Sequence, residues 1–304
     1  AGGGYPCTSE FKFGDRIFHN WQPENKTISL AQALVESCDT VFYNFARSWW
    51  SRDEHQVGLG NTPPEVMQMY ARMFGLGSDT GIDLPEGTED PGRIPDRAWR
   101  KEVWEANKSQ YCATAHRTGD PLFQDLCERG YLWRGGDSIN MSIGQGDVQV
   151  SPLQLADAYA AIANGGTLVR PHLGARVLGP GGKVSQTFDV KPRARVDAAP
   201  SVIEYVQRAL AEVPVKGTAR YPFRSWPLAE IPMAAKTGSA EIVGKQPFSW
   251  FASYGPANDP RYVVVAVVEQ AGHGAQVAGP IVRRIFDELL DRPPLPIVYG
   301  GKSD

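Results

Sequence analysis

The stretch IPMAAKTGSAEIVGKQPFSWFASYGP, Ile231 to Pro256, determines the fold class that the sequence predicts. Two strand-like runs in it are joined by the short turn Val243-Gly244-Lys245, and a third run, RYVVVAVVEQ, follows after Ala257-Asn258-Asp259. Strands with such short connections pair as antiparallel neighbours. The last hundred residues are therefore predicted to form a mostly antiparallel sheet.

Apolar residues at helical spacing, with capping residues ahead of them, indicate helices on both sides of these strands. The helical stretches are SLAQALVES (29–37), VFYNFARSWW (41–50), TPPEVMQMYARMFGLG (62–77), SPLQLADAYAAIANGG (151–166), VIEYVQRALAEV (202–213) and GAQVAGPIVRRIFDELL (274–290). We expect an α/β fold with segregated elements, in which helices pack on an antiparallel sheet and a helical portion precedes it.

Three local features complete the predicted layout. FKFGDRIFHNW (11–21) has apolar residues on both sides of Gly14-Asp15 and indicates a small hairpin. The helix at 62–77 is expected to open on a capping box from Thr62 to Glu65, with Pro63 as its first residue. Residues 80–136 show little periodicity, so we expect long surface loops there with one or two short helices.

Composition limits the classes of protein that the chain can belong to. Its 304 residues suffice for one large domain, and 42% hydrophobic with 21% charged residues is an ordinary globular composition. A net charge of −3 gives no reason to expect nucleic acid or an anionic membrane surface as a partner. No apolar run approaches the roughly 18 residues that span a bilayer, and AGGGYPC lacks the regions of a signal peptide. Any anchor or export signal would lie upstream of Ala1.

The four cysteines form no CxxC pair, which argues against a zinc ribbon or a thioredoxin motif. Cys112 and Cys127 enclose a short polar loop and are a candidate disulfide in an oxidising compartment, the alternative being two unlinked thiols. A metal site built from Cys7, His19 and Cys38 would have no recognised spacing. We therefore expect no metal.

Two short motifs carry groups suited to catalysis. SCD, at Ser37–Asp39, places a hydroxyl and a carboxylate in an interhelical corner, where both can face a cleft or simply end one helix and cap the next. KTGS, at Lys236–Ser239, places an ammonium, hydroxyls and a glycine in a strand. An edge strand of this kind can pair with an extended peptide, although a surface lysine before a bulge has the same pattern.

Together these motifs resemble a known signature. S-x-x-K, S-D-N and K-T-G mark penicillin-binding proteins and class A β-lactamases, and SCD and KTGS match the second and third in the right order. SLAQALVESCDTVFY, FGLGSDTGIDLPEG, IGQGDVQVSPLQLADAYAAIANGG and AAKTGSAE each resemble stretches of class B penicillin-binding proteins. SCDTVFY, with aspartate where many relatives have asparagine, is most similar to the elongation-type enzymes.

The resemblance implies a serine transpeptidase fold, in which a five-stranded antiparallel sheet between helices lies beside an all-helical subdomain. Residues 1–304 would form a single domain, incomplete at its N-terminus, with the helical subdomain at about 25–200 and the sheet at about 201–292. The implied reaction is peptidoglycan D,D-transpeptidation, in which a serine attacks D-Ala–D-Ala and an amine of a neighbouring stem peptide takes the acyl group. An activated hydroxyl and oxyanion donors are needed, and no cofactor.

The resemblance also assigns roles within the two motifs. Ser37 would relay a proton toward the leaving nitrogen, and Lys236 would support it electrostatically. Asp39 would position the substrate amide, but a carboxylate lacks the donor of an asparagine, so that role does not carry over unchanged.

The rest of KTGS would bind the substrate. Thr237 and Ser239 would hold its carboxylate, or that of a penicillin, and the backbone N–H near Ser239 would contribute to the oxyanion hole. Gly238 would leave room for the donor peptide along the strand.

The nucleophile motif S-x-x-K has only one early match, SEFK at Ser9–Lys12. Gly14-Asp15 and the flanking phenylalanines indicate extended chain there, so serine and lysine would not stack as they do on a helix. We expect the true motif upstream of Ala1, and we expect the chain on its own to be inactive.

The same motifs are compatible with other functions. A D,D-carboxypeptidase or a β-lactamase shares the fold and passes the acyl group to water. A module that binds peptidoglycan or a β-lactam without turnover, or an inactive remnant, would account for the missing S-x-x-K. By resemblance, the partners are stem peptides, β-lactams and a membrane glycosyltransferase of the elongation machinery, and the domain lies on the outer face of the cytoplasmic membrane.

Overall fold

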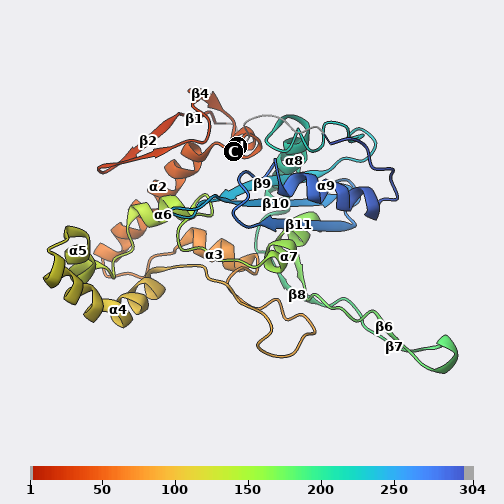
Figure 1. Cartoon of the computed structure of the whole chain (residues 1–304), viewed down its shortest axis with the longest axis horizontal. Helices are drawn as coiled ribbons and strands as arrows, with labels where there is room; N and C mark the ends of the chain where they lie inside the picture. The colour runs from red at the N-terminus through yellow and green to blue at the C-terminus, as the bar shows by residue number, and fades with distance from the viewer. Residues whose placement is uncertain (1–2, 298–304) are drawn as a thin grey trace. The chain divides into compact units, whose positions relative to one another are not determined.

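The computed structural model describes residues 3–297 and has an antiparallel sheet of three strands in the order β11-β10-β9 (Figure 1). These strands are β9 (Ala234–Ala240), β10 (Phe248–Gly255) and β11 (Tyr262–Val268). The antiparallel pairing that the short turns predicted is confirmed. The resemblance implied five strands, whereas within residues 3–297 this sheet has three, so β9 and β11 are its two edges.

Helices cover both faces of this sheet. Helix α9 (Ala278–Leu289) packs on one face, where Phe251 and Val264 of the strands meet Phe286. Helices α7 (Pro152–Ala163) and α8 (Pro200–Lys216) pack on the other face, where a buried cluster forms around Tyr254. Burying each of these large side chains contributes roughly 1.5–3 kcal/mol, so the sheet is a firm base for side chains at its edge.

The helix N-termini largely follow the capping residues of the sequence. Helix α1 (Leu30–Val35) begins after Ser29, whose hydroxyl accepts a hydrogen bond from the Gln32 amide. Helix α7 begins after Ser151, which forms a reciprocal capping box with Gln154. Helix α2 (Asp39–Gly58) begins at the aspartate of SCD.

Helix α3 (Val66–Met73) departs from the prediction because it begins at Val66, and residues 62–65 are not helical. Glu65 has a φ of 44°, which lies outside the helical region, and its carboxylate accepts a hydrogen bond from the Arg97 amide at 3.1 Å. Residues 62–65 therefore do not form the first turn of α3, where the sequence placed the capping box.

The prediction of loops with short helices at 80–136 is wrong for most of that range. It holds the 22-residue helix α4 (Arg97–Thr118), followed by α5 (Pro121–Arg129) and α6 (Gly135–Met141). Helix α4 has caps that were readable, Asp96 at its start and Gly119 in a left-handed conformation at its end. Its side chains are mostly exposed, so it lacks the apolar stripe on which the prediction relied. A disulfide joins Cys112 to Cys127, the pair that the sequence indicated.

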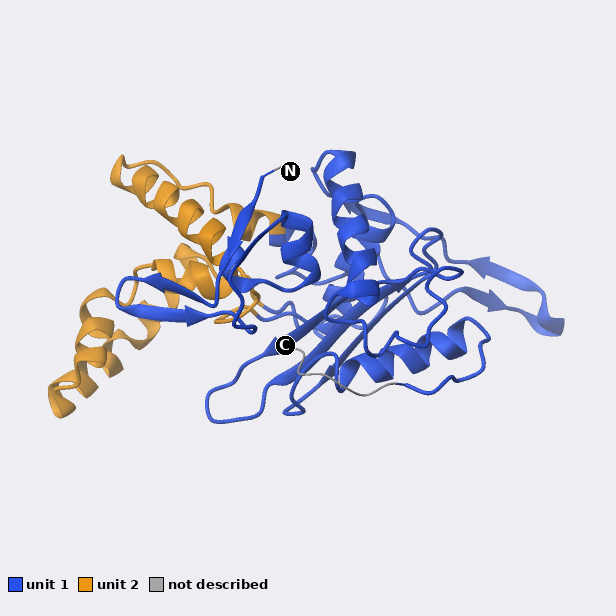
Figure 2. Ribbon diagram, turned by 90° about the horizontal axis from the view of Figure 1, so that it is seen from above, with its two compact units in different colours: residues 1–41, 71–92, 149–304 blue, residues 42–70, 93–148 orange. Residues whose placement is uncertain are grey.

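The chain separates into two compact units (Figure 2). The first comprises residues 1–41, 71–92 and 149–304 and contains the three-stranded sheet. The second comprises residues 42–70 and 93–148 and is helical. The helical unit is smaller than the range 25–200 that the resemblance suggested, because α1 and α7 pack with α8 in the first unit. Within residues 3–297, no helix has the length and apolar character needed to cross a membrane.

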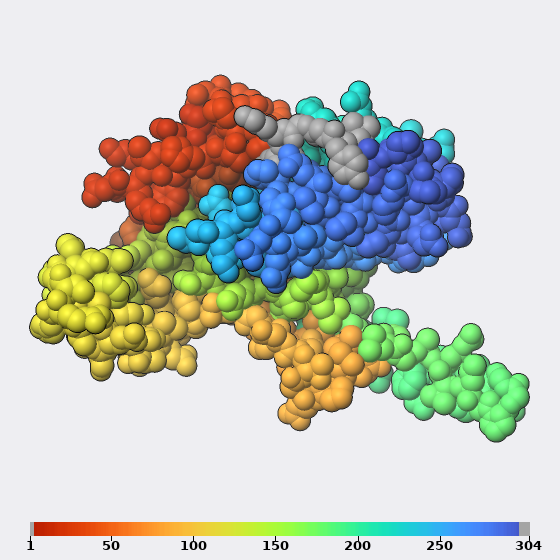
Figure 3. Space-filling model, in the orientation of Figure 1, coloured from red at the N-terminus to blue at the C-terminus, as the bar shows by residue number. Residues whose placement is uncertain are grey.

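Short two-stranded sheets complete the first unit. Strand β1 (Tyr5–Cys7) pairs with β4 (Lys26–Ile28), and β2 (Glu10–Phe13) pairs with β3 (Arg16–His19) in the hairpin predicted at Gly14-Asp15. Two further pairs are β5 (Thr167–Val169) with β8 (Pro192–Arg195) and β6 (Arg176–Leu178) with β7 (Val184–Thr187). The β6–β7 hairpin, whose turn contains the 3-10 helix Pro180–Gly182, extends away from the sheet (Figure 3).

Glu89 organises the loop that leads into α4, and we expect Glu89→Gln to lower the free energy of unfolding by about 1–2 kcal/mol. Burial works to raise the pKa of Glu89, but hydrogen bonds from Thr80 and Gly81 outweigh it, and the net pKa is below its ordinary value of 4.5. A depressed carboxyl pKa stabilises the fold above about pH 4.5, and that stability is lost as the pH falls through the lowered value. The difference between wild type and variant in urea unfolding should therefore be constant from pH 6 to 8 and shrink in acid; a difference that grew in acid would contradict this.

Candidate active site

Ser37 and Lys236 meet although 199 positions separate them in the sequence. The Lys236 Nζ donates a hydrogen bond to the Ser37 Oγ at 2.9 Å and a second one to the Thr237 carbonyl at 3.0 Å. Ser37 lies in the tight turn between α1 and α2, and Lys236 lies on the edge strand β9. Both side chains are half-buried, so an approaching molecule can reach a pair whose orientation the fold has already set.

Ser37 adopts a backbone conformation that disfavours a residue with a side chain. Its φ is 59°, in the left-handed region, which costs a non-glycine residue roughly 1–2 kcal/mol. Such conformations persist when the surrounding structure determines them and are frequent at active sites. Here the turn is closed by hydrogen bonds from the Ser37 amide to the Leu34 carbonyl and from the Cys38 amide to the Ala33 carbonyl.

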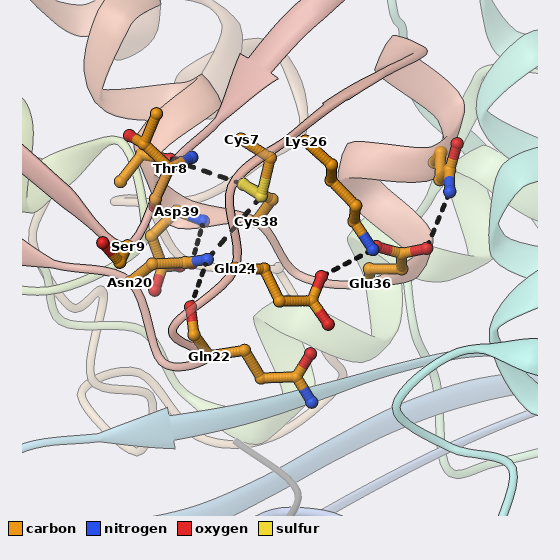
Figure 4. Close-up of a disulfide and its surroundings, with 12 residues drawn as sticks. Cys7, Thr8, Ser9, Asn20, Gln22, Glu24, Lys26, Glu36, Cys38 and Asp39 are labelled. Carbon is orange, nitrogen blue, oxygen red and sulfur yellow. Dashed lines mark hydrogen bonds and ion pairs between the residues drawn. A yellow bond between two sulfur atoms is a disulfide. The ribbon is translucent and has the colours of Figure 1, made fainter.

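Asp39 is the first residue of α2 and is held from two sides (Figure 4). Its amide donates to the Asn20 Oδ1 at 3.0 Å, and its Oδ2 accepts from the Trp21 amide at 3.3 Å. A carboxylate at this position also has a favourable interaction with the N-terminal dipole of the helix. The third residue of SCD is thus oriented by the segment that follows β3.

The hydroxyl side chains of KTGS differ in their surroundings. Thr237 is buried, and its hydroxyl shares a hydrogen bond of 2.7 Å with the hydroxyl of Thr218, just after α8. Ser239 is more accessible, and its hydroxyl lies 3.5 Å from the His273 Nδ1. Of the two, Ser239 is the better placed to contact a molecule that lies along the strand.

Gly238, within KTGS, and Gly274, which lies close to it, differ in how much space their surroundings leave for a side chain. A Cβ added at Gly238 would lie 3.4 Å from the Cβ of Trp250, so the internal packing alone nearly leaves room for a side chain. A Cβ at Gly274, in the loop between β11 and α9, would lie within 3 Å of the Gly238 backbone. This loop therefore lies directly on the strand at Gly238.

A cavity of about 230 Å³ lies beside the residues that neighbour the two motifs, and neither Ser37 nor Lys236 lines it. Its lining includes Glu36, which precedes Ser37, and Thr218, which bonds to Thr237; the rest of it is Trp21, Gln22, Glu24, Lys26, Lys216, Gly217, Arg220 and Tyr221. Lys26 bridges two carboxylates, and its hydrogen bonds to Glu24 and Glu36 raise its pKa above the ordinary 10.5. Three cationic and two anionic side chains thus leave the lining with a formal charge of +1.

The structure does not arrange SEFK as a nucleophile motif, nor Cys7, His19 and Cys38 as a metal site. Ser9 directly precedes β2 and Lys12 lies within it, so SEFK is extended and does not place the two side chains on one helical face. Cys7 and Cys38 are joined in a disulfide, which leaves neither thiol to bind a metal with His19.

Sequence reasoning missed several residues around the motifs, namely Cys7, Asn20, Trp21, Thr218 and His273. One signal was available, because Cys38 is the central residue of SCD and a partner for it could have been sought. The other contacts join segments far apart in the chain, and no spacing or periodicity in the sequence reveals them.

The chemistry of the Ser37–Lys236 pair follows from its hydrogen bond. An ammonium group has only donors, so the Ser37 oxygen is the acceptor and its own proton remains available for another group. Within residues 3–297, β9 pairs with β10 and is the last strand on its side of the sheet. The arrangement combines a hydroxyl that keeps its own proton, an ammonium group and a terminal strand, the kind of strand to which an extended peptide can add.

A family model and two relatives of known name both identify transpeptidases as the proteins that this chain resembles. A family model described as the penicillin binding protein transpeptidase domain matches residues 7–287. The chain is similar to peptidoglycan D,D-transpeptidase MrdA of Acinetobacter baumannii, with 29% identity over 92% of this chain and 37% of that protein. It is also similar to peptidoglycan D,D-transpeptidase PbpA of Mycobacterium tuberculosis, with 27% identity over 96% of this chain and 47% of that protein. The chain thus spans less than half the length of either relative.

Solved structures share the fold. A chain of a peptidoglycan synthase complex, studied for its coordination of polymerization and crosslinking, matches with a TM-score of 0.67 and 27% identity over 94% of this chain and 41% of that one. The ceftriaxone acyl-enzyme complex of penicillin-binding protein A from M. tuberculosis matches with a TM-score of 0.66 over 94% of this chain and 55% of that one. At 21% identity, the second likeness concerns the fold alone.

Proposed function

Because the chain belongs to the penicillin-binding protein transpeptidase family, we propose that it supplies the second and third motifs of an elongation-type peptidoglycan D,D-transpeptidase. The observation that carries the proposal is the 2.9 Å hydrogen bond from Lys236 to Ser37, which joins the two motifs in one site. The names of the two relatives, both peptidoglycan D,D-transpeptidases, support the same reaction.

The nucleophile in this proposal is a serine of an S-x-x-K segment outside residues 1–304. It attacks the carbonyl carbon of the penultimate D-Ala, the peptide bond to the last D-Ala breaks, and an acyl-enzyme forms. The lysine of that segment takes the proton of the attacking serine, and Ser37 relays a proton from this lysine to the leaving nitrogen, so that Ser37 ends with its own hydroxyl restored. The Lys236 ammonium keeps the Ser37 oxygen oriented for that transfer. An amine of a second stem peptide then takes the acyl group and releases the serine.

The donor stem peptide would lie along β9, the terminal strand of the described sheet. Backbone groups of the strand would pair with the peptide, and the N–H near Ser239 would stabilise the developing oxyanion. The Ser239 hydroxyl would bind the terminal carboxylate, with Thr237 holding the strand through its bond to Thr218. Gly238 would let the peptide approach, and Asp39 would orient the Ser37 turn and the substrate amide.

The partners and location follow from the same proposal. β-Lactams mimic the donor peptide and would leave the serine acylated, in keeping with the family description and with the ceftriaxone acyl-enzyme of a structural neighbour. A membrane glycosyltransferase would supply the glycan strands, as the likeness to a chain of a peptidoglycan synthase complex suggests. The domain would then work on the outer face of the cytoplasmic membrane.

Labelling with a fluorescent penicillin, followed by peptide mass mapping of the adduct, tests this function. We expect the label on the longer protein at a serine outside residues 1–304, and none on the isolated chain. Label on Ser9 would keep the acyl chemistry but move the nucleophile into β2. If neither protein is labelled, acyl transfer is excluded, and a non-catalytic module that binds peptidoglycan or β-lactam becomes the better assignment.

A label that turns over within minutes would indicate transfer to water, as in a carboxypeptidase or a β-lactamase. A label that persists, together with cross-linked product from two stem peptides, is the result expected for a transpeptidase.

A further inference from the structure

A disulfide joins the centre of the SCD motif to strand β1. Cys38, between Ser37 and Asp39, is bonded to Cys7, and both residues are buried, with 1% and 2% of their surfaces exposed (Figure 4). The bond ties the turn that carries Ser37 to a strand 31 positions earlier in the chain. While the disulfide is intact, Cys38 and the turn that contains it cannot move away from β1.

Hydrogen bonds next to the disulfide fix the residues on both sides of it. The Thr8 amide donates to the Thr40 Oγ1 at 3.0 Å, and that hydroxyl donates back to the Thr8 carbonyl at 3.1 Å. These bonds hold the start of α2 against the end of β1.

Asn20 connects the disulfide to the catalytic motif. Its Oδ1 accepts from the Asp39 amide, while its Nδ2 donates to the Gln22 carbonyl at 2.9 Å and lies 3.6 Å from the Cys7 Sγ. The side chain is 9% exposed, so its polar atoms are directed into the protein and toward this turn. One amide thus contacts both the disulfide and the first residue of α2.

We propose that Cys7 and Asn20 are positioning residues for acyl transfer. Through the disulfide to Cys38 and the bond to Asp39, they hold Ser37 in its left-handed conformation, with its Oγ against the Lys236 ammonium. They touch no substrate. The inference rests on the proposed function, and it makes the reaction depend on an oxidised Cys7–Cys38 pair.

The second disulfide offers a matched control. Cys112–Cys127 joins α4 to α5 in the helical unit, which contains neither Ser37 nor Lys236. Removing either bond frees the unfolded chain and lowers stability. Only removal of Cys7–Cys38 should also change the catalytic turn, so the comparison separates positioning from stabilisation.

The experiment uses the longer protein that carries the S-x-x-K segment and compares wild type with C7A/C38A, C112A/C127A and N20A. Penicillin acylation is followed over a range of concentrations, at a temperature at which thermal unfolding shows each protein to be folded. We expect the limiting acylation rate of C7A/C38A and N20A to fall about 10- to 100-fold, as for a reacting group displaced by about 1 Å. The half-saturating concentration should change little, and C112A/C127A should stay within about twofold of wild type.

Reduction provides a second measurement that does not depend on a variant folding. Dithiothreitol reduces the disulfide to two thiols and is itself oxidised to a cyclic disulfide. Dithiothreitol should slow acylation of C112A/C127A by the same factor as the C7A/C38A substitution slows acylation of wild type. It should leave the acylation rate of C7A/C38A unchanged. After reoxidation, the acylation rate of C112A/C127A should recover. Equal acylation by C7A/C38A and wild type, or no effect of dithiothreitol on C112A/C127A, would overturn the inference. A wild-type protein that no penicillin acylates would overturn the proposed function, and this inference with it.

Discussion

Lys236→Ala, in the longer protein that we propose carries the nucleophile, is expected to lower the rate constant of penicillin acylation about 10²–10³-fold, the usual cost of losing one preorganised donor at a reacting centre. The reason lies in the hydrogen bond from Lys236 to Ser37, which joins the two motifs. Without the ammonium, the Ser37 oxygen loses the hydrogen bond from Lys236, and the site loses a positive charge beside the proposed position of the substrate carboxylate. Stopped-flow acylation with a chromogenic cephalosporin measures the rate constant directly.

Two further variants show whether the effect belongs to this contact. Lys236→Arg keeps the charge but has a planar group that fits the 2.9 Å bond poorly, so it should recover only part of the activity. Lys245→Ala, in the exposed turn between β9 and β10, removes an equal charge from the same hairpin and should change the rate constant less than twofold. If Lys236→Ala were acylated as fast as Lys245→Ala, Lys236 would have no part in the reaction.

Asp287→Ala is expected to lower the free energy of unfolding by about 3–5 kcal/mol, because it leaves a buried guanidinium without its counter-charge. Arg283 is completely buried in α9, and its Nε and Nη2 both donate to the Asp287 Oδ1, at 3.2 and 3.0 Å. Its guanidinium also lies 4.6 Å from the ring centroid of Trp226. Urea unfolding, followed by circular dichroism, gives the change.

The matched control is Glu288→Ala, which removes an exposed carboxylate from the next position of the same helix and should cost less than about 0.5 kcal/mol. The double variant R283M/D287L, which removes both charges, should recover much of the loss. If Asp287→Ala and Glu288→Ala lowered stability equally, the buried ion pair would contribute nothing that an exposed carboxylate does not.

Local patterns in the sequence predicted the parts of the fold that depend on neighbouring residues. The short turns around β10 predicted an antiparallel sheet, and Ser29 and Ser151 marked the first residues of α1 and α7. Helix α4 was missed because its side chains are mostly exposed, and the prediction gave more weight to apolar periodicity than to the caps at Asp96 and Gly119. The capping box was predicted too early in the chain, because residues 62–65 are not helical and the Glu65 carboxylate accepts a hydrogen bond from Arg97, 32 positions later.

The site shows the same division. Its motif residues were recognisable in the sequence because SCD and KTGS follow one another in the order of the family signature. The structure brings Ser37 and Lys236 of these motifs together. The contacts of Cys38, Asp39 and Thr237 with Cys7, Asn20 and Thr218 were not predictable, because each depends on tertiary packing that no periodicity encodes.

The position of β9 at the end of the described sheet also affects how the protein behaves in solution. A strand whose backbone groups can pair with a peptide can pair equally well with a strand of a second molecule, which is the usual route to edge-to-edge aggregation. A charged side chain on such a strand opposes that association, and Lys236 is the one charged residue of β9. The lysine that donates a hydrogen bond to Ser37 therefore also reduces association between molecules through β9. A peptide bound along this strand should likewise keep concentrated protein monomeric.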